Sequence, residues 1–234
     1  MRSEYGTAAV ADRLTPDAAR LTATLRITEI FFSLQGETSR VGLPTVFIRL
    51  TGCPLRCGYC DTAYAFHGGA TTQIAAVFDA VAQYRTPYVT VTGGEPLAQK
   101  NCIVLLQALC DKGYSVSLET SGAIDIAAVD ARVSRILDIK TPGSGEAARN
   151  LWSNLAHLTA HDEIKFVICD EADYGWAKEQ LAARRLDAVC PVLFAPSYRD
   201  LSATRLAEWI LRDQLPVRMQ VQLHKQLWGE QPGR

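Results

Sequence analysis

"TGCPLRCGYCDT", residues Thr51–Thr62, places Cys53, Cys57 and Cys60 at C-x3-C-x2-C spacing with no fourth cysteine nearby. A tetrahedral zinc site takes four ligands and a disulfide takes two, so neither accounts for three thiols by itself. A 4Fe–4S cluster held by three thiolates leaves one iron open to an outside ligand. The triplet therefore favours a metal centre with one position free for a reactant.

Other uses of the three thiols stay open at this point. Structural zinc needs a fourth ligand, for which His67 and His224 are candidates farther along the chain. Cysteines without a metal are a third possibility, because a buried free thiol behaves as a small apolar side chain. Gly58 and Tyr59, between the last two cysteines, suit a tight loop around a bulky cluster without proving it.

The composition is typical of a globular protein with a well-buried core. Of the residues 48% are hydrophobic and 21% are charged, and the formal net charge is −1, which gives no overall attraction to nucleic acid or acidic membranes. No apolar run approaches the roughly 18 to 20 residues needed to cross a bilayer. The N-terminus carries Asp12 and Asp17 and no apolar block, unlike a signal peptide. Seven cysteines, an odd number, favour a reducing compartment, so we expect a cytoplasmic protein.

Strand and helix patterns alternate along the chain after residue 24. Strands are expected at 25–34, 45–52, 88–94, 114–120, 135–140, 163–168, 189–196 and 218–223, and helices at 71–84, 101–112, 126–133, 174–185 and 204–212. Thr71 or Thr72 would cap the first helix. Strands joined by helical crossovers pair in parallel, and the chain is short for a complete eight-fold barrel, which takes ~250 residues. The sequence therefore predicts an α/β fold, a partial, open parallel β/α barrel over residues 25–234, preceded by a flexible N-terminal extension, residues 1–24.

A second motif lies at the end of the strand that follows the cysteines. "TGGEP", Thr92–Pro96, combines two glycines, which allow close backbone approach, with Glu95, which can accept a hydrogen bond from an ammonium group. Alone, the segment is typical of an ordinary strand-to-helix turn. Together with the cysteine triplet it resembles the radical S-adenosylmethionine (SAM) enzymes. The resemblance implies a 4Fe–4S cluster whose open iron binds SAM, with Gly94 and Glu95 at the methionine part of SAM.

A narrower resemblance extends over nearly the whole chain, from Ile27 to Trp228. "FFSLQGETSRVGLPTVFIRLTGCPLRCGYCDT", "SLETSG", "LDIKTPGSGE", "DEIKFVI" and "LHKQLWG" follow one another in this order. The ordered series resembles the 7-carboxy-7-deazaguanine synthase family of deazapurine (queuosine-type) biosynthesis. The resemblance implies that a 5′-deoxyadenosyl radical takes hydrogen from carbon 6 of 6-carboxy-5,6,7,8-tetrahydropterin. The ring then contracts and loses ammonia to give 7-carboxy-7-deazaguanine, with SAM regenerated and Mg²⁺ assisting.

The resemblance also implies roles for single residues, although none is itself the catalyst because the cluster and SAM carry the radical chemistry. The cluster ligands would be Cys53, Cys57 and Cys60; Thr62 would bind Mg²⁺; Gly94, Glu95, Ser121, Lys140 and Ser197 would contact SAM; and Leu34, Gln35, Gly36, Glu37, Arg49, Thr92 and His224 would contact the substrate. Lys165 is a weaker candidate, and Lys225 together with His224 matches a His-Lys pair that lies near the substrate in the family. A hydroxyl such as that of Thr62 suits Mg²⁺, a hard cation that prefers oxygen ligands.

Several of these positions have ordinary structural interpretations as well. Thr62 is also consistent with a turn residue, Arg49 with a surface arginine on a strand, and His224 with a packing residue. The chain departs from the family pattern at Asp138, where some relatives have serine, and by continuing past a C-terminal proline found in some relatives.

Two other functions compete with this interpretation. Activating enzymes that install glycyl radicals on partner proteins share both motifs, but they resemble this chain much less at "SLQGE" and "LHKQLW". A zinc-stabilised binding module without catalysis belongs to a different class and leaves "TGGEP" without a role. For the preferred enzyme, the resemblance implies a homodimer and an electron donor such as flavodoxin or ferredoxin. We expect neither direct nucleic-acid binding nor membrane attachment.

Overall fold

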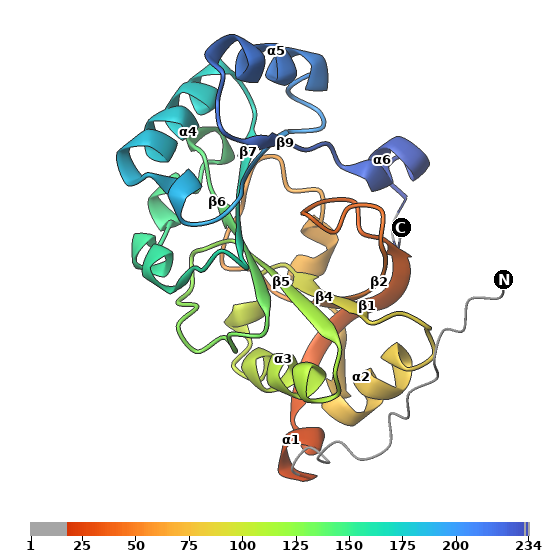
Figure 1. Cartoon of the computed structure of the whole chain (residues 1–234). Coiled ribbons are helices and arrows are strands. Elements are labelled where there is room, and N and C mark those ends of the chain that lie inside the picture. Colours follow the sequence, from red (N-terminus) through yellow and green to blue (C-terminus); the bar gives the residue numbers. More distant parts are fainter. Residues whose placement is uncertain (1–17, 232, 234) are drawn as a thin grey trace, which may run out of the picture.

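A curved, open sheet forms the centre of the structure (Figure 1). The computed structural model describes residues 18–231 and 233, and within them nine strands follow the order β3-β1-β2-β4-β5-β6-β7-β8-β9. The strands are β1 (Thr24–Leu34), β2 (Pro44–Leu50), β3 (Ala70–Gln73), β4 (Tyr88–Gly93), β5 (Ser115–Thr120), β6 (Ser134–Ile139), β7 (Glu163–Ile168), β8 (Val192–Pro196) and β9 (Arg218–Met219). Strand β1 pairs antiparallel with β2 and β3, and pairing is parallel from β2 to β9. The predicted open, mostly parallel α/β architecture is confirmed.

Helices cover the outside of the sheet. They are α1 (Ala18–Thr22), α2 (Ile74–Val81), α3 (Cys102–Asp111), α4 (Glu171–Arg184), α5 (Ala203–Asp213) and α6 (Leu223–Trp228), with short 3-10 helices at Ala63–Phe66, Pro96–Ala98, Pro142–Ser144, Ala147–Arg149, Trp152–His157 and Leu186–Ala188. Helix α3 packs on β5, α4 on β7 and α5 on β8. Helix α6 lies apart from α4 and α5, towards β1 and β2 (Figure 1). Within the described residues, no helix has the length and apolar character to cross a membrane.

The parallel strands separate apolar from polar side chains. In β4, Val89 and Val91 are fully buried in the core beneath the helices, and burying each contributes roughly 1.5–3 kcal/mol. Thr90 and Thr92 alternate with them and point to the other face of the sheet. Glu119 of β5 shares this inner face, where Thr92 donates a hydrogen bond to it. The interior of the open barrel is therefore polar and suited to a polar ligand.

The connection between β1 and β2, residues 35–43, runs through the interior of the open barrel and is called the interior loop below. The Thr38 amide donates a hydrogen bond to the Gln220 side chain over 2.6 Å, and the Gln220 amide group donates to the Thr38 carbonyl over 2.9 Å. Arg40 donates to the Ser115 carbonyl at the start of β5 over 3.0 Å. The interior loop thus connects β1 and β2 with β5 in the middle of the sheet and with the segment that follows β9.

The helix predicted at 126–133 is wrong, because these residues form successive turns. The Ala127 amide donates to the Asp125 carboxylate over 2.8 Å, and the Arg132 amide donates to the Asp130 carboxylate over 2.9 Å. Such local side-chain bonds compete with the hydrogen bonds of a helix. The apolar spacing that suggested a helix comes from turns packed on the core.

Two local predictions also differ from the structure. Thr71 and Thr72 belong to β3, so neither caps α2, and Gln73 takes the N-cap position without a side-chain bond. Only two residues of the strand predicted at 218–223 pair with the sheet, because the chain then turns towards the interior loop. Of the predicted N-terminal extension, residues 1–17 lie outside the described residues.

Candidate active site

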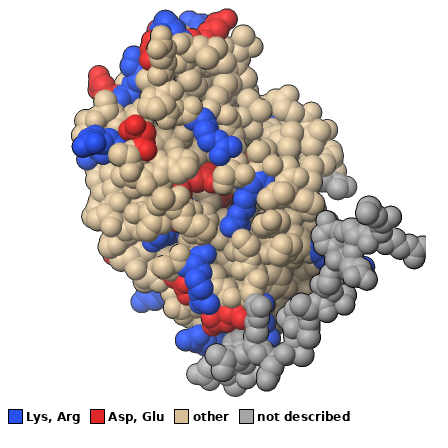
Figure 2. All heavy atoms as spheres, in the orientation of Figure 1, with Lys and Arg blue, Asp and Glu red and all other residues tan. Residues whose placement is uncertain are grey.

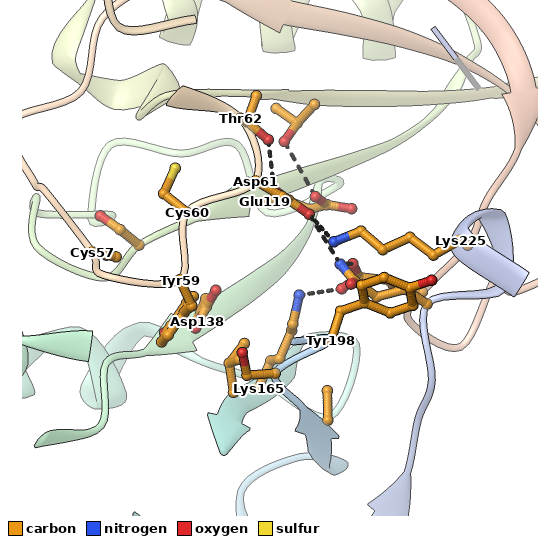
Figure 3. A pocket seen from close by; sticks show the side chains of 18 of the residues that line it. Cys57, Tyr59, Cys60, Asp61, Thr62, Glu119, Asp138, Lys165, Tyr198 and Lys225 are labelled. Carbon is orange, nitrogen blue, oxygen red and sulfur yellow. Dashed lines mark hydrogen bonds and ion pairs between the residues drawn. The ribbon is translucent and has the colours of Figure 1, made fainter. Parts of the chain in front are cut away.

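A cavity of about 300 Å³ lies at the carboxyl ends of the parallel strands, where open α/β sheets generally bind ligands. Its wall contains the predicted residues Cys53, Cys57, Cys60, Thr62, Leu34, Gln35, Gly36, Glu37, Arg49, Thr92, Gly94, Ser121, Lys140, Ser197 and His224. Lys165 and Lys225 belong to the same wall (Figure 3). Motifs that are far apart in the sequence therefore meet in one cavity.

The three cysteines are positioned by the loop that follows β2. Leu55 is 1% exposed and anchors this loop in the protein, and the Cys60 amide donates to the Cys57 carbonyl over 3.2 Å. All seven cysteines of the chain are free thiols. Burial raises the pKa of the Cys57 thiol to about 11, so this thiol becomes a thiolate ligand only when a bound cation displaces its proton.

The donor set of the cysteine loop fits a multi-iron cluster. A 4Fe–4S cluster takes each thiolate at a different iron, so three thiolates leave one iron open. Within residues 18–231 and 233, no three His, Cys, Asp or Glu side chains are grouped as ligands of a single metal ion. Of the two histidines considered for zinc, His67 is exposed, whereas His224 lies in the cavity wall.

Gly94 and Glu95 follow β4 and have different surroundings. A Cβ atom on Gly94 would lie 2.3 Å from the Gly52 carbonyl oxygen, so this glycine permits close packing against the cysteine loop. Glu95 is 0% exposed, and its carboxylate accepts hydrogen bonds from the Thr120 hydroxyl at 3.0 Å and from the Ser121 amide and hydroxyl at 2.7 and 2.6 Å. Glu95 thus holds Ser121 at the cavity wall. The contact of Glu95 with the ammonium group of SAM stays a prediction.

A buried ion pair joins the interior loop to β7. The Glu37 carboxylate pairs with the Lys165 ammonium group, and their side chains are 11% and 12% exposed. Burial opposes the ionisation of Glu37, but the Lys165 charge outweighs burial and holds the pKa of Glu37 below its ordinary value. Both groups are therefore charged at neutral pH.

Glu119 is a candidate site residue that the sequence motifs did not single out. It lies in the cavity wall and accepts hydrogen bonds from Gln35 at 3.3 Å and from Thr92 at 3.2 Å. Burial, and then the negative charge of Glu37, raise the pKa of Glu119. The sequence could have identified Glu119 through the alternation of side chains in β5. Leu118 is buried in the core, so the next side chain, Glu119, points to the barrel interior.

Two polar atoms near the cysteine loop lack partners in the described structure. The Tyr59 hydroxyl and Asp138 Oδ1 are buried and make no hydrogen bond there, and both residues line the cavity. The other Asp138 oxygen accepts a hydrogen bond from the Lys140 ammonium group at 2.9 Å. Buried unpaired polar atoms cost free energy, so this region is suited to a polar ligand such as SAM. Ser197, farther along the wall, donates to Asp200 over 2.6 Å.

Arg49 and Thr62 lie on another part of the wall. Arg49 Nε donates to Glu29 Oε1 over 2.7 Å, and its guanidinium group lies 5.7 Å from the centre of the Phe31 ring. The predicted alternation in β2 is confirmed, because Ile48 on the opposite face is fully buried in the core. The Thr62 hydroxyl donates to the neighbouring Asp61 carboxylate over 2.8 Å (Figure 3). Both side chains are therefore held in fixed directions.

The outer surface does not resemble a nucleic-acid interface on the face shown in Figure 2. Lys and Arg side chains are interspersed there with Asp and Glu. Nucleic-acid recognition typically uses a continuous basic patch or stripe. This face offers none.

Known proteins share this fold and these motifs. Residues 47–139, which include the three cysteines and Gly94, match the family model of the Radical SAM superfamily. The fold and the site therefore define a radical SAM enzyme, a class that implies a 4Fe–4S cluster and SAM. The 7-carboxy-7-deazaguanine synthase of Chlorobaculum tepidum is 46% identical over 211 residues, covering 88% of this chain and 96% of that protein, and that of Koribacter versatilis is 44% identical over 220 residues, covering 87% and 97%. The chain belongs to the 7-carboxy-7-deazaguanine synthase family.

A solved structure extends the similarity to three dimensions. The crystal structure of QueE from Escherichia coli superimposes with a TM-score of 0.70 at 25% sequence identity. The matched region covers 86% of this chain and 95% of that protein. The open sheet thus belongs to a fold that is known from experiment.

Proposed function

We propose that this chain converts 6-carboxy-5,6,7,8-tetrahydropterin to 7-carboxy-7-deazaguanine with loss of ammonia. The observation that carries the proposal is that the cysteine loop and the interior loop line one cavity. Cys53, Cys57 and Cys60 would hold the 4Fe–4S cluster, which together with SAM would supply the radical chemistry that removes hydrogen from the substrate. The side chains of this chain bind, orient and shield the reactants.

The interior loop supplies groups that recognise the pterin. A pterin edge alternates hydrogen-bond donors and acceptors, and the amide of Gln35 and the carboxylates of Glu37 and Glu119 can match it. Lys165 keeps Glu37 ionised, whereas burial favours the protonated form of Glu119. One carboxylate can therefore accept hydrogen bonds while the other can also donate one.

The substrate carboxylate is assigned to Arg49 and to Mg²⁺ at Thr62. A guanidinium group binds a carboxylate through two parallel hydrogen bonds, and Arg49 is already oriented by Glu29. Mg²⁺ typically keeps several waters and takes few protein oxygens, so the Thr62 hydroxyl and the substrate carboxylate together suit it. Both groups hold the ring in one orientation for hydrogen removal.

The proposed activity also implies a compartment, an oligomeric state and an electron donor. The enzyme acts as a cytoplasmic homodimer, and a flavodoxin or ferredoxin supplies the single electron that reduces the cluster. Free thiols at all seven cysteines support a reducing compartment. Size-exclusion chromatography with light scattering tests the dimer.

The activation of a partner protein fits the geometry less well. A macromolecular substrate needs an open mouth, but α6 lies beside the interior loop, where the Leu223 amide donates to the Gly36 carbonyl over 2.9 Å. Beyond α6, Glu230 pairs with Arg199 at 2.8 Å, and both residues line the cavity. The C-terminal segment therefore covers part of the mouth, which favours a small-molecule substrate over a macromolecule.

Anaerobic reconstitution with iron and sulfide tests the proposal. We expect about four irons per chain and an EPR signal of the reduced cluster that changes on addition of SAM, as for a cluster with one open iron. The loaded enzyme should then release ammonia and 7-carboxy-7-deazaguanine from the carboxy-tetrahydropterin, detected by mass spectrometry. One zinc per chain and no cluster would exclude this function. A cluster that cleaves SAM but leaves the pterin unchanged would instead exclude this substrate.

The acid side of the pH profile should depend on His224. Burial lowers the pKa of His224, so its imidazole is neutral above about pH 6.5, its ordinary pKa. Acidification through the lowered pKa adds a cation near Lys225 and Lys165, and we expect kcat/KM to fall there. His224→Gln, which keeps hydrogen-bonding groups but does not titrate, should remove this dependence from a profile measured between pH 5 and 8. An unchanged acid limb in His224→Gln would assign it to another group.

A further inference from the structure

We propose that Lys225 is a positioning residue that fixes the Asp61–Thr62 turn and so directs the Thr62 hydroxyl towards its cation. The identity of that cation, Mg²⁺, rests on the proposed function. The contacts that carry the inference are all within the chain. They connect α6, at the C-terminal end, with the turn that follows the third cysteine.

The ammonium group of Lys225 is held in a nearly closed environment. The Lys225 side chain is 7% exposed, and its Nζ lies 2.6 Å from Asp61 Oδ2 (Figure 3). It also lies 5.0 Å from the centre of the Tyr198 ring. The Asp61 side chain is 38% exposed, so the buried Lys225 ammonium group depends on Asp61 for its charged partner, and this contact fixes the Asp61 carboxylate.

The second oxygen of Asp61 sets the direction of Thr62. The Thr62 hydroxyl donates its hydrogen to Asp61 Oδ1 over 2.8 Å. A hydroxyl has one hydrogen and two acceptor lone pairs, so this bond turns the lone pairs of Thr62 to other directions. Lys225 therefore acts on the cation site through Asp61, without reaching the cation itself.

The residues at the start of α6 also contact the interior loop. The Gln222 side chain donates to Glu37 Oε1 over 2.8 Å and to Asp61 Oδ2 over 3.4 Å. The Leu223 amide donates to the Gly36 carbonyl over 2.9 Å. Residues 222–223 thus fix the position of the interior loop relative to the Asp61–Thr62 turn.

The test uses the cluster-loaded enzyme in its oxidised state with SAM and the carboxy-tetrahydropterin, so that no turnover occurs. Mn²⁺ replaces Mg²⁺ as a probe visible by EPR, and hydrogen–deuterium exchange reports on the amides of residues 60–66. Loss of a group that orients a metal ligand typically weakens metal binding 10–100-fold. We therefore expect Lys225→Met to raise the Kd for Mn²⁺ about tenfold or more and to accelerate exchange at 60–66.

Matched variants separate positioning from general loss of structure. Lys178→Met removes an ammonium group paired with Asp213 at 2.5 Å on the outer helices, and both readouts should stay at their wild-type values. Asp61→Asn weakens the same ion pair at its acidic partner, so it should also raise the Kd for Mn²⁺ and accelerate exchange at 60–66. Combining Asp61→Asn with Lys225→Met should add little to either effect, because the two residues belong to one network. If Lys225→Met does not fold, Asp61→Asn carries the test.

The outcomes distinguish this proposal from the function on which it rests. Wild-type exchange at 60–66 and wild-type Mn²⁺ affinity in a folded Lys225→Met or Asp61→Asn enzyme would overturn the positioning role. Faster exchange in these variants, combined with a wild-type enzyme that binds no Mn²⁺, would support the positioning of the turn and remove the divalent cation from the proposed function.

Discussion

Replacing Gly94 by alanine should abolish turnover and impair cluster loading. The new Cβ would lie 2.3 Å from the Gly52 carbonyl oxygen and 2.8 Å from Cys53 Cβ. Backbone atoms cannot rotate away as side chains do, and the Glu95 amide already holds the Gly52 carbonyl at 2.8 Å. The cysteine loop must therefore shift. Since a displacement of about 1 Å can cost about 100-fold in rate, we expect at least that loss in kcat, together with fewer irons per chain after reconstitution.

Gly58→Ala is the matched control, because Gly58 lies in the same loop but has room. A Cβ atom there would lie 3.9 Å from the Gly143 carbonyl oxygen, an ordinary van der Waals distance. Iron content and the EPR signal of this variant should equal those of wild type. Wild-type iron content and kcat in Gly94→Ala would show that the turn after β4 relaxes and does not set the position of Cys53.

The architecture was predictable from the sequence because its strands have strong local patterns. In β4, valines alternate with threonines, and the helix that becomes α3 ends at Gly113, which has a φ of 85° in the structure. Such patterns need no knowledge of distant residues. Predictions failed where competing local bonds decide the structure, as in the turns at 126–133, which Asp125 and Asp130 stabilise.

The path of the interior loop was not predictable, because its partners are remote. Thr38 bonds to Gln220, which is 182 positions away, and no local pattern encodes such a pairing. For the same reason the motif did not indicate that Glu95 bonds to Thr120 and Ser121, which lie at the end of the neighbouring strand. The motifs were sufficient to predict which residues line the cavity. The orientation of their side chains depends on tertiary contacts, which the motifs do not contain.

The inner face of the barrel also explains why stability and substrate binding are connected in this fold. Polar side chains there have few water partners, so each buried charge depends on a protein partner or a ligand. Lys165 forms an ion pair with Glu37. Burial lowers the pKa of Lys165, but the negative charges of Glu37, Asp138 and Glu119 outweigh burial and raise it. The removal of this one cation should therefore affect both folding and recognition.

Lys165→Met should destabilise the folded protein by about 3–5 kcal/mol at pH 7.5, the usual cost of breaking a buried ion pair. The variant leaves Glu37 and Glu119 buried without their cation, so the pKa of Glu37 in the folded state rises above its ordinary 4.5, and that of Glu119, already raised in wild type, rises further. A folded state that binds more protons than the unfolded state loses stability as pH rises. The variant should therefore be more stable at pH 5.5 than at pH 7.5. In wild type, Glu37 has a lowered pKa and contributes stability above pH 4.5 that is lost on acidification.

Urea unfolding followed by circular dichroism at the two pH values measures this reversal. Adding Glu37→Gln to Lys165→Met removes the carboxylate that lost its direct partner, and we expect it to restore part of the lost stability and to reduce the pH dependence. Lys178→Met, whose ammonium group pairs with Asp213 on the outer helices, should show neither effect. Equal destabilisation by Lys165→Met at both pH values would mean that the lysine contributes through packing of its alkyl chain, and that the carboxylates of the cavity find other partners.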